Sequence, residues 1–252
     1  MSQLVLLDPR IHRNLKVDPG KVAAHGAFER SVPVVLSEFQ NLAIQYPIII
    51  TKNTETGQFV CVSVFGFEEA ENLFWRDGAW NAVYVPLNIA RQPFFAGENE
   101  PAPKGQKQDQ FVVCIDIESD SVQEAGGEAL FDQHGAATEY LHRMQSTLAQ
   151  LLEGETQTRK FVQKLKELNL LKPMSLEITF VNDQSQRVAG AYTIDETRLE
   201  GLSQEEFLEL HSLGYLHPIY TMIVSLGQLY SLIEKKNTLL SQGSQWFKQA
   251  ND

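Results

Sequence analysis

The sequence predicts an α+β fold, with a mostly antiparallel sheet built largely from the N-terminal half and packed with helices mainly from the C-terminal half. Three observations support this prediction. Short runs of β-branched and aromatic residues dominate the first half. Helical spacing of apolar residues begins after Gly135. The strands precede and interrupt the helices without a regular β–α–β rhythm, which favours antiparallel pairing.

For the first 65 residues, the sequence predicts short extended pieces, one helix and two strands. Residues 1–30 contain several helix breakers, so we expect no helix there. A helix is predicted to start with Ser37 as its N-cap and to end before Pro47, because a residue that precedes proline is pushed out of the helical region. Strands are predicted at 48–51 and 58–65. The second has apolar side chains on both faces, which indicates a central, covered strand.

A hairpin and a short helix follow. Asp77-Gly78 is a strong hairpin signal between the runs 72–75 and 80–85. Proline at position 86 suits the first turn of a helix, which is predicted to stop before the proline at position 93.

Two polar loops surround the next predicted strand, 111–117. Residues 97–109 are rich in Gly, Pro and charge, and we expect them to form a mobile segment or lid. Residues 118–128 form an acidic loop, which we consider as a sub-boundary within a single domain that spans residues 1–240.

The second half predicts helices interrupted by one hairpin. One helix is expected to end at Gly154, and a second to span 158–168. Ser203 has Glu206 at the capping-box position and is expected to start another helix. The remaining predictions are a hairpin of strands 176–181 and 187–194, a terminal helix from about His217 to Leu240, and a loose tail at 241–252.

Composition excludes some classes of partner. The net charge is −11 and the pI is about 5.0. A surface of that sign repels phosphates, so we expect no nucleic-acid partner and no docking on anionic lipid. Cys61 and Cys114 lie in apolar alternating runs typical of buried small residues, and a disulfide between them stays open. Because the N-terminus lacks the features of a secretory signal, we expect a cytoplasmic, reduced protein.

One segment, 216–233, lacks charged residues and is about as long as a bilayer-spanning helix. It contains several polar residues that would be costly in lipid. We therefore expect a buried core helix and no membrane insertion.

Signatures of cofactor or metal chemistry are missing from the sequence. There is no His-x-Asp/Glu pair, glycine-rich dinucleotide fingerprint, P-loop or Gly-x-Ser-x-Gly. We predict no metal and no cofactor, and the catalytic residues are unknown. The acidic residues before and after the aromatic run are interpreted as solvated loops, with paired acid–base catalysis as the alternative. They are Glu68, Glu69, Glu71, Asp77, Asp116 and Glu118.

The most unusual stretch is residues 80–95, which combine aromatic residues, two prolines and a single charge, Arg91. These aromatic rings are able to line a pocket, with Arg91 clamping a carboxylate or phosphate. The alternative is that the rings belong to the core and Arg91 forms a structural ion pair. The predicted ligand-binding residues are Trp75, Trp80, Asn81, Tyr84 and Arg91.

Several pieces of the chain resemble the SapC-like family of bacterial proteins, in the family's order. They are SEFQNLAIQYPIII at 37–50, DGAWNAVYVPLNIARQPF at 77–94, GEALFDQHG at 127–135, AYTIDETRLEGL at 191–202 and LHSLGYLHPIYTMIVSL at 210–226. Family members often have Arg-Arg-Tyr-Pro-Phe where this chain has Ala-Arg-Gln-Pro-Phe at 90–94. If these positions bind a ligand, this protein is expected to bind it differently.

The resemblance implies a single SapC-like domain and no set of catalytic residues. The family's name reflects an association with surface-layer proteins, and members are sometimes described as peptide-transporter permeases. The single weak apolar segment argues against a permease here. Association of family members with halogenase-like and outer-membrane-receptor genes implies natural-product or glycan-related metabolism.

Three hypotheses about function follow. The first is a cytoplasmic binding or accessory protein for a peptide, a glycan fragment or an aromatic metabolite. The second is an enzyme of unrecognised type, metal-dependent in one version, that acts on an aromatic or peptidyl substrate. The third is a structural partner in an assembly, with a homo-oligomer or another protein as its partner.

Overall fold

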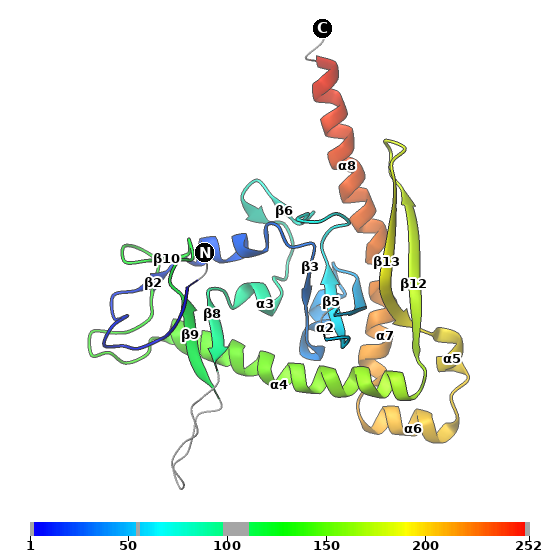
Figure 1. The fold of residues 1–252 in the computed structure, drawn as a ribbon, viewed down its shortest axis with the longest axis horizontal. Coiled ribbons are helices and arrows are strands. Elements are labelled where there is room, and N and C mark those ends of the chain that lie inside the picture. Colours follow the sequence, from blue (N-terminus) through cyan, green and yellow to red (C-terminus); the bar gives the residue numbers. More distant parts are fainter. Residues whose placement is uncertain (1–2, 54–55, 98–110, 250–252) are drawn as a thin grey trace. The chain divides into compact units, whose positions relative to one another are not determined.

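The fold was obtained as a computed structural model that describes residues 3–53, 56–97 and 111–249. It confirms the α+β prediction, because every strand pair is antiparallel and the longest helices lie in the C-terminal half (Figure 1). Most of the predicted loop at 97–109 lies outside the described residues.

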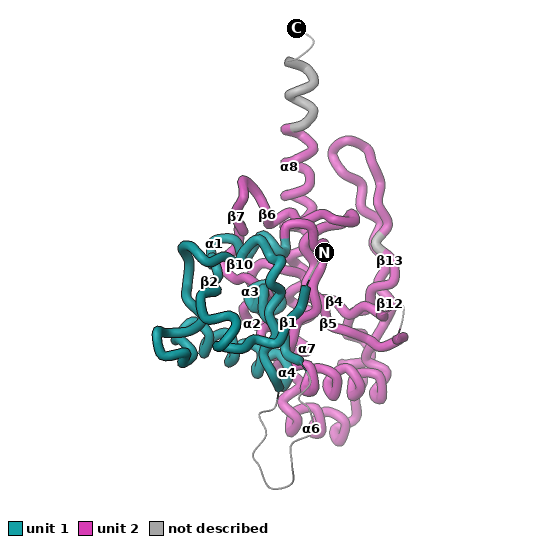
Figure 2. The backbone as a smooth tube through the Cα atoms, turned by 60° about the vertical axis from the view of Figure 1, so that its left-hand side comes forward, with its two compact units in different colours: residues 1–26, 87–153 teal, residues 27–86, 154–252 magenta. Residues whose placement is uncertain are grey.

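The chain forms two compact units, and each is made of two separate stretches of the sequence (Figure 2). Unit 1 consists of residues 1–26 and 87–153, and unit 2 consists of 27–86 and 154–252. The chain therefore passes between units at 26/27, 86/87 and 153/154, and none of these points falls in the loop 118–128.

Unit 1 contains two small sheets, with strand orders β1-β9-β8 and β10-β2-β11. Its buried core includes Val17, Phe94, Ile115 and Leu130. The elements are β1 (Leu4–Leu6), β2 (Lys16–Val17), α1 (Pro19–Val22), η1 (Ala23–Gly26), α3 (Leu87–Ala90), β8 (Phe94–Gly97), β9 (Val112–Asp116), β10 (Val122–Gln123), β11 (Glu128–Ala129) and the first half of α4 (Glu139–Glu167).

Unit 2 is built on a five-stranded sheet of order β12-β13-β4-β5-β3. The strands are β3 (Ser31–Pro33), β4 (Ile48–Lys52), β5 (Phe59–Val64), β12 (Leu171–Thr179) and β13 (Ser185–Ile194), and β6 (Trp75–Arg76) and β7 (Ala79–Trp80) form a separate hairpin. The helices are η2 (Leu36–Glu38), α2 (Phe39–Leu42), the second half of α4, α5 (Glu196–Glu200), α6 (Gln204–Ser212), α7 (Leu216–Ser225) and α8 (Gln228–Gln249).

Several predicted elements of unit 2 are confirmed. Strand β5 lies between β4 and β3, as its two apolar faces predict. Asp77 and Gly78 both have positive φ, 52° and 74°, as a two-residue hairpin turn requires. Ser203 caps α6 in a complete capping box with Glu206.

The predicted cap at Ser37 is wrong. The chain starts with the 3-10 turn η2 before α2, and the N-cap residue is Val35. The Glu38 carboxylate accepts a hydrogen bond from the Val35 amide at 3.2 Å. A buried acidic side chain at the third helical position thus binds the amide of the N-cap residue.

The prediction that a helix ends at Gly154 is also wrong, since α4 runs through this position without a break. Gly154 instead permits close packing, because a Cβ atom built on it would lie 2.7 Å from the Cβ of Val35. The two predicted helices are therefore one helix of 29 residues.

The single predicted terminal helix is two helices, α7 and α8, separated at Leu226 and Gly227. α8 continues to Gln249, beyond the predicted end near Leu240. Among the described residues, no helix combines the length and apolar character needed to cross a bilayer.

Candidate functional site

The predicted ligand-binding residues fall into two groups, because the chain passes from unit 2 to unit 1 between Pro86 and Leu87. Four lie in unit 2, where Trp75 and Trp80 are paired across the β6–β7 hairpin. The Asn81 amide donates to the carbonyls of Arg76 and Ala79, each at 3.2 Å, and so holds the hairpin turn.

Trp80 and Tyr84 belong to a chain of hydrogen bonds inside unit 2. The Trp80 indole donates to the Tyr46 hydroxyl at 2.8 Å, and that hydroxyl donates to the Tyr84 carbonyl at 2.6 Å. The Tyr84 hydroxyl donates to the buried Glu38 carboxylate at 3.1 Å. Burial first, and then the Glu38 charge, raises the pKa of Tyr84. The pKa of Tyr46 is also raised by burial. Both phenols therefore stay neutral near pH 7.

Arg91 lies in unit 1, directly after α3. It donates to the Asn88 side chain at 3.0 Å and to the Phe94 carbonyl at 2.7 Å. Its guanidinium stands 4.3 Å from the ring centroid of Phe95. These contacts hold the turn between α3 and β8. The assignment of this set of residues to a ligand stays a prediction.

A cleft lies on one face of the five-stranded sheet of unit 2, and the hairpin β12–β13 makes it. β13 pairs with β4 at two positions, Ala191 with Thr51 and Tyr192 with Ile50. If β13 continued straight from Ala191 through Gly190, it would run along β4 past Lys52. On β5, the next strand of the sheet, that direction leads to Phe59, which is the register partner of Lys52.

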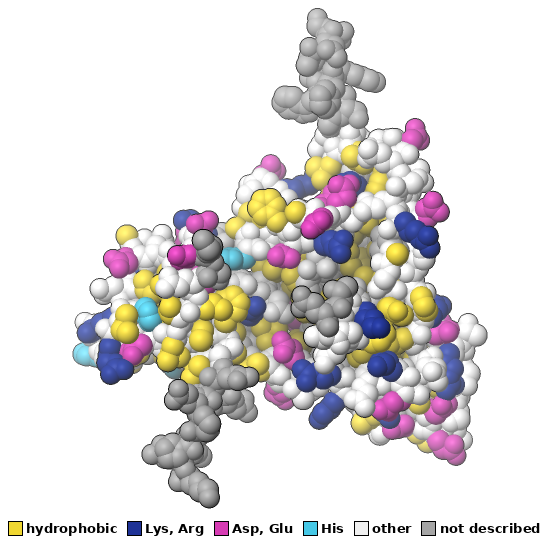
Figure 3. Space-filling view, in the orientation of Figure 1, with side chains coloured by type: hydrophobic (Ala, Val, Ile, Leu, Met, Phe, Trp, Pro, Cys, Tyr) yellow, Lys and Arg dark blue, Asp and Glu magenta, His cyan; other side chains and the backbone are white. Residues whose placement is uncertain are grey.

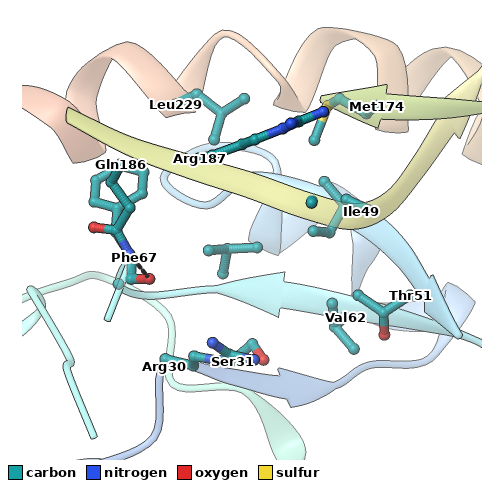
Figure 4. A pocket seen from close by; sticks show the side chains of 14 residues that line it. Arg30, Ser31, Ile49, Thr51, Val62, Phe67, Met174, Gln186, Arg187 and Leu229 are labelled. Carbon is teal, nitrogen blue, oxygen red and sulfur yellow. Dashed lines mark hydrogen bonds between the residues drawn. The ribbon is translucent and has the colours of Figure 1, made fainter. Parts of the chain in front are cut away.

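The hairpin turns the other way. The Gln186 amide donates to the carbonyl of Phe67 at 2.6 Å, and Phe67 follows the opposite end of β5 (Figure 4). β13 therefore bends sharply and passes in front of the sheet face. The tip of the hairpin confirms this path, since the ring centroids of Phe180 and Phe67 are 5.5 Å apart.

A β-bulge supplies the bend. Between the pairs Met174–Ala191 and Leu176–Val188, one residue of β12 faces two residues of β13, Ala189 and Gly190. A bulge bends a strand and increases its twist. Gly190 has φ 79°, a conformation that glycine adopts without the steric cost of a side chain.

The cleft has a volume of about 190 Å³ and an apolar floor with a polar margin. Figure 4 shows Leu229 of α8 near Arg187, while Ile49, Val62 and Thr51 extend from the sheet. The lining residues are Arg30, Ser31, Ile49, Thr51, Val62, Val64, Gly66, Phe67, Met174, Gln186, Arg187, Ala189, Ala191 and Leu229.

The charge of the lining is opposite to that of the whole protein. The two charged lining residues are Arg30 and Arg187, while the chain as a whole carries −11. Acidic and basic side chains are mixed over the visible surface rather than separated by sign (Figure 3). Arg187 donates to Ser175 at 3.2 Å, and its register partner is Glu177. Within the described part of the chain, neither arginine forms an ion pair. The cleft is therefore suited to an anionic group.

Comparison with protein families matches residues 7–232 to the SapC family. The chain belongs to the SapC family. This confirms the resemblance seen in the sequence, over nearly the whole chain. No curated protein and no solved structure matches it.

A second polar cluster of this SapC-family chain lies in unit 1. His25 Nε2 is 3.0 Å from the Ser119 hydroxyl, which lies 2.8 Å from the Ser121 hydroxyl. A Ser–His pair at this distance resembles an activated nucleophile. However, Ser119 is buried and its oxygen also accepts from the Ser121 amide at 3.2 Å. These bonds hold the loop after β9, and we assign the cluster no ligand.

Other reactive groups also have structural surroundings. Cys61 and Cys114 are free thiols, and burial raises the pKa of Cys61 to about 12, so its nucleophilic thiolate is scarce near neutral pH. Of the predicted acidic residues, Glu68 and Glu71 pair with Lys236. The described residues contain no cluster of three or more His, Cys, Asp or Glu side chains arranged for a metal.

Sequence patterns missed the cleft of this SapC-family chain because its lining comes from segments more than 100 residues apart. One signal was present. Gly190 is an isolated glycine inside a predicted strand, and such a glycine indicates a bulge. It indicates where the strand bends, but not which face it then covers.

Proposed function

We propose that this SapC-family protein binds a small aromatic carboxylate in the cleft of unit 2. The observation that carries the proposal is the pairing of an apolar floor with two arginines and no carboxylate among the described lining residues. A carboxylate is recognised by arginine through charge-assisted hydrogen bonds. Of the three ligand classes expected from the sequence, which are a peptide, a glycan fragment and an aromatic metabolite, a small aromatic carboxylate belongs to the third.

The size of the cleft supports a ligand of about one ring. An apolar cavity of about 150 Å³ is able to hold benzene. The volume of about 190 Å³ leaves room for a ring and a short acidic arm. The side chains of Ile49 and Val62 provide the floor, and Met174 and Leu229 provide apolar contacts beside it.

Isothermal titration calorimetry with phenylacetate tests this proposal. We expect phenylacetamide, which has nearly the same shape but no charge, to bind at least about tenfold more weakly, since a charge-assisted hydrogen bond contributes about 1.5–3 kcal/mol. Raising the salt concentration should weaken phenylacetate binding, because the arginines are exposed.

Variants locate the binding site. Arg30→Gln and Arg187→Gln should each weaken phenylacetate binding by about tenfold. Arg159→Gln is the matched control, because Arg159 is an exposed arginine of α4 outside the cleft. Equal binding of the acid and the amide, or equal effects of all three substitutions, would overturn the proposal.

The proposed compartment is the cytoplasm. The two free cysteines support it, since cysteines in an oxidising compartment are commonly paired as disulfides. Fractionation of cells that make the protein, with an antibody against it, tests this part of the proposal. Recovery in a secreted or periplasmic fraction would contradict it.

A further inference from the structure

The inner end of hairpin β12–β13 is fixed to the sheet. Ala191 and Tyr192 pair with β4, and the Tyr192 ring packs edge-on against Phe59 with centroids 4.9 Å apart. Ala191 and Ile194 are buried. Strand pairing and core packing together anchor this end.

The outer end, residues 176–188, is attached differently. Beyond the bulge, the described strands give β13 no partner other than β12. Its contacts with the rest of unit 2 include the Gln186–Phe67 hydrogen bond, the Phe180–Phe67 ring contact and a 3.1 Å hydrogen bond from the Val181 amide to Asn237 of α8. Ile178 and Phe180 of this end are also buried, at 6% and 4% exposed. The outer end is therefore held by side-chain packing and by bonds that involve side chains, and these contacts are able to break without disrupting the β12–β13 ladder.

The surface that receives the hairpin tip is itself firmly held. The Phe67 amide donates to Glu71 at 2.8 Å, and the other oxygen of Glu71 accepts from Lys236 of α8 at 2.5 Å. Lys236 is only 7% exposed and also binds Glu68. Because this network joins the turn after β5 to α8, the receiving surface is fixed and the hairpin is the part able to move.

The bulge has the properties of a hinge. Gly190 has φ 79°, and a Cβ atom built on it would meet no atom within 4 Å. A glycine in open space changes its backbone angles at low steric cost. Ala189, beside it, is exposed and lines the cleft.

We propose that residues 176–188 are a gate over the cleft, that the gate swings at Ala189–Gly190, and that the Gln186–Phe67 hydrogen bond is its latch. The gate's role in binding rests on the proposed function, while its motion does not. Opening would separate Gln186, Arg187 and Ala189 from the sheet floor and so control ligand entry and residence.

Hydrogen–deuterium exchange of the ligand-free protein tests the motion. We expect the Val181 amide, which binds Asn237 of α8 and not the β12–β13 ladder, to exchange faster than the amides at 191–194 and in β4, because a swing of the hairpin breaks that bond at a lower free-energy cost than opening a buried sheet. Protection of the Val181 amide equal to that of 191–194 would overturn the gate.

A latch variant gives a second test. Gln186→Leu removes the donor to Phe67 at similar size, and exchange of the Val181 amide should rise about fivefold, the factor expected for one hydrogen bond. Gln184→Leu is the matched control, since the Gln184 side chain is exposed at the tip of the same hairpin and has no hydrogen bond within the described structure. Unchanged exchange in the latch variant, or an equal rise in the control, would overturn the latch.

Stopped-flow kinetics with phenylacetate separates the two proposals. If the gate controls access, Gln186→Leu should raise the association and dissociation rates together. Fast exchange of the Val181 amide without phenylacetate binding would support the motion and overturn the proposed function. Tight binding with a uniformly protected hairpin would do the reverse.

Discussion

Gly154 and Val35 touch so closely that no other residue type fits at position 154 without movement: a Cβ atom built on Gly154 would lie 2.7 Å from the Cβ of Val35 and within 3.0 Å of both of its γ-methyls. Helix α4 therefore packs directly on the chain that leads from β3 into η2. Glycine costs about 1 kcal/mol relative to alanine inside a helix, and here the close packing explains its presence.

Gly154→Ala should consequently destabilise the protein by up to about 2 kcal/mol, because the overpacking cost of about 1–3 kcal/mol is offset by a gain of about 1 kcal/mol in helix propensity. Urea unfolding measures the change. Val35→Ala alone should also destabilise, since Val35 is buried. The double variant should lose less than the sum of the two, because Val35→Ala removes both γ-methyls and leaves only the Cβ of these three close contacts. Additive losses would mean that the two residues do not compete for space.

Thr158, one turn later in α4, binds the same segment. Its hydroxyl accepts from the Leu36 amide at 3.0 Å and donates to the Gly154 carbonyl at 2.7 Å. Thr158→Val leaves that amide without its partner and should cost about 1–3 kcal/mol in urea unfolding. Thr147→Val is the control, since the half-buried Thr147 makes the equivalent bond to a helix carbonyl, at Arg143, and no hydrogen bond to another segment of the described chain. A similar loss in both variants would contradict the role of Thr158 in holding Leu36.

A substitution at Tyr46 tests whether the predicted aromatic residues stabilise the fold and do not bind the ligand. Tyr46→Phe removes the hydroxyl that joins Trp80 to the Tyr84 carbonyl, and it should lower the free energy of unfolding by about 1–3 kcal/mol. Phenylacetate affinity at a temperature where the variant is folded should stay unchanged. A large loss of affinity with intact stability would instead favour the aromatic run as the binding site.

Lys236 holds two carboxylates at a buried position. Lys236→Met leaves Glu68 and Glu71 without their cation and should cost about 3 kcal/mol, the loss expected when one partner of a buried ion pair is removed. Lys160→Met, at an exposed position of α4, should change stability little. Thermal unfolding compares the two, and equal melting temperatures would show that the network contributes nothing.

The lowered pKa of His25 predicts that the stability of the protein depends on pH. Burial lowers its pKa below the ordinary 6.5; Asp116 and Asp120 oppose this shift and Arg91 adds to it. The folded state then binds fewer protons than the unfolded state below pH 6.5, so stability should fall as the pH drops from 6.5 toward 5. His25→Asn should flatten this part of the profile measured by urea unfolding at each pH. The carboxyl groups with lowered pKa values contribute mainly at the acidic end of this window and below it, and they contribute equally in the parent and the variant, so the difference between the two profiles reports His25. An unchanged slope in the variant would exclude His25 as its cause.

Local elements and the family follow from sequence patterns alone. Asp77-Gly78 predicted the β6–β7 turn because a two-residue hairpin requires positive φ at both positions. Ser203 and Glu206 predicted the start of α6 because a capping box satisfies backbone donors within one turn. These signals depend on neighbours in the chain, which a sequence displays directly.

Contacts between distant segments set where helices continue and which face becomes a cleft. Gly154 is a helix-ending residue by local rules, yet α4 continues because Val35, distant in sequence, occupies the space a side chain would need. Arg30 and Arg187 lie in segments with no shared pattern, and they line one cleft because the bulge at Gly190 bends β13 across the sheet. The direction of that bend depends on contacts such as Gln186 with Phe67, which close only when the chain is folded.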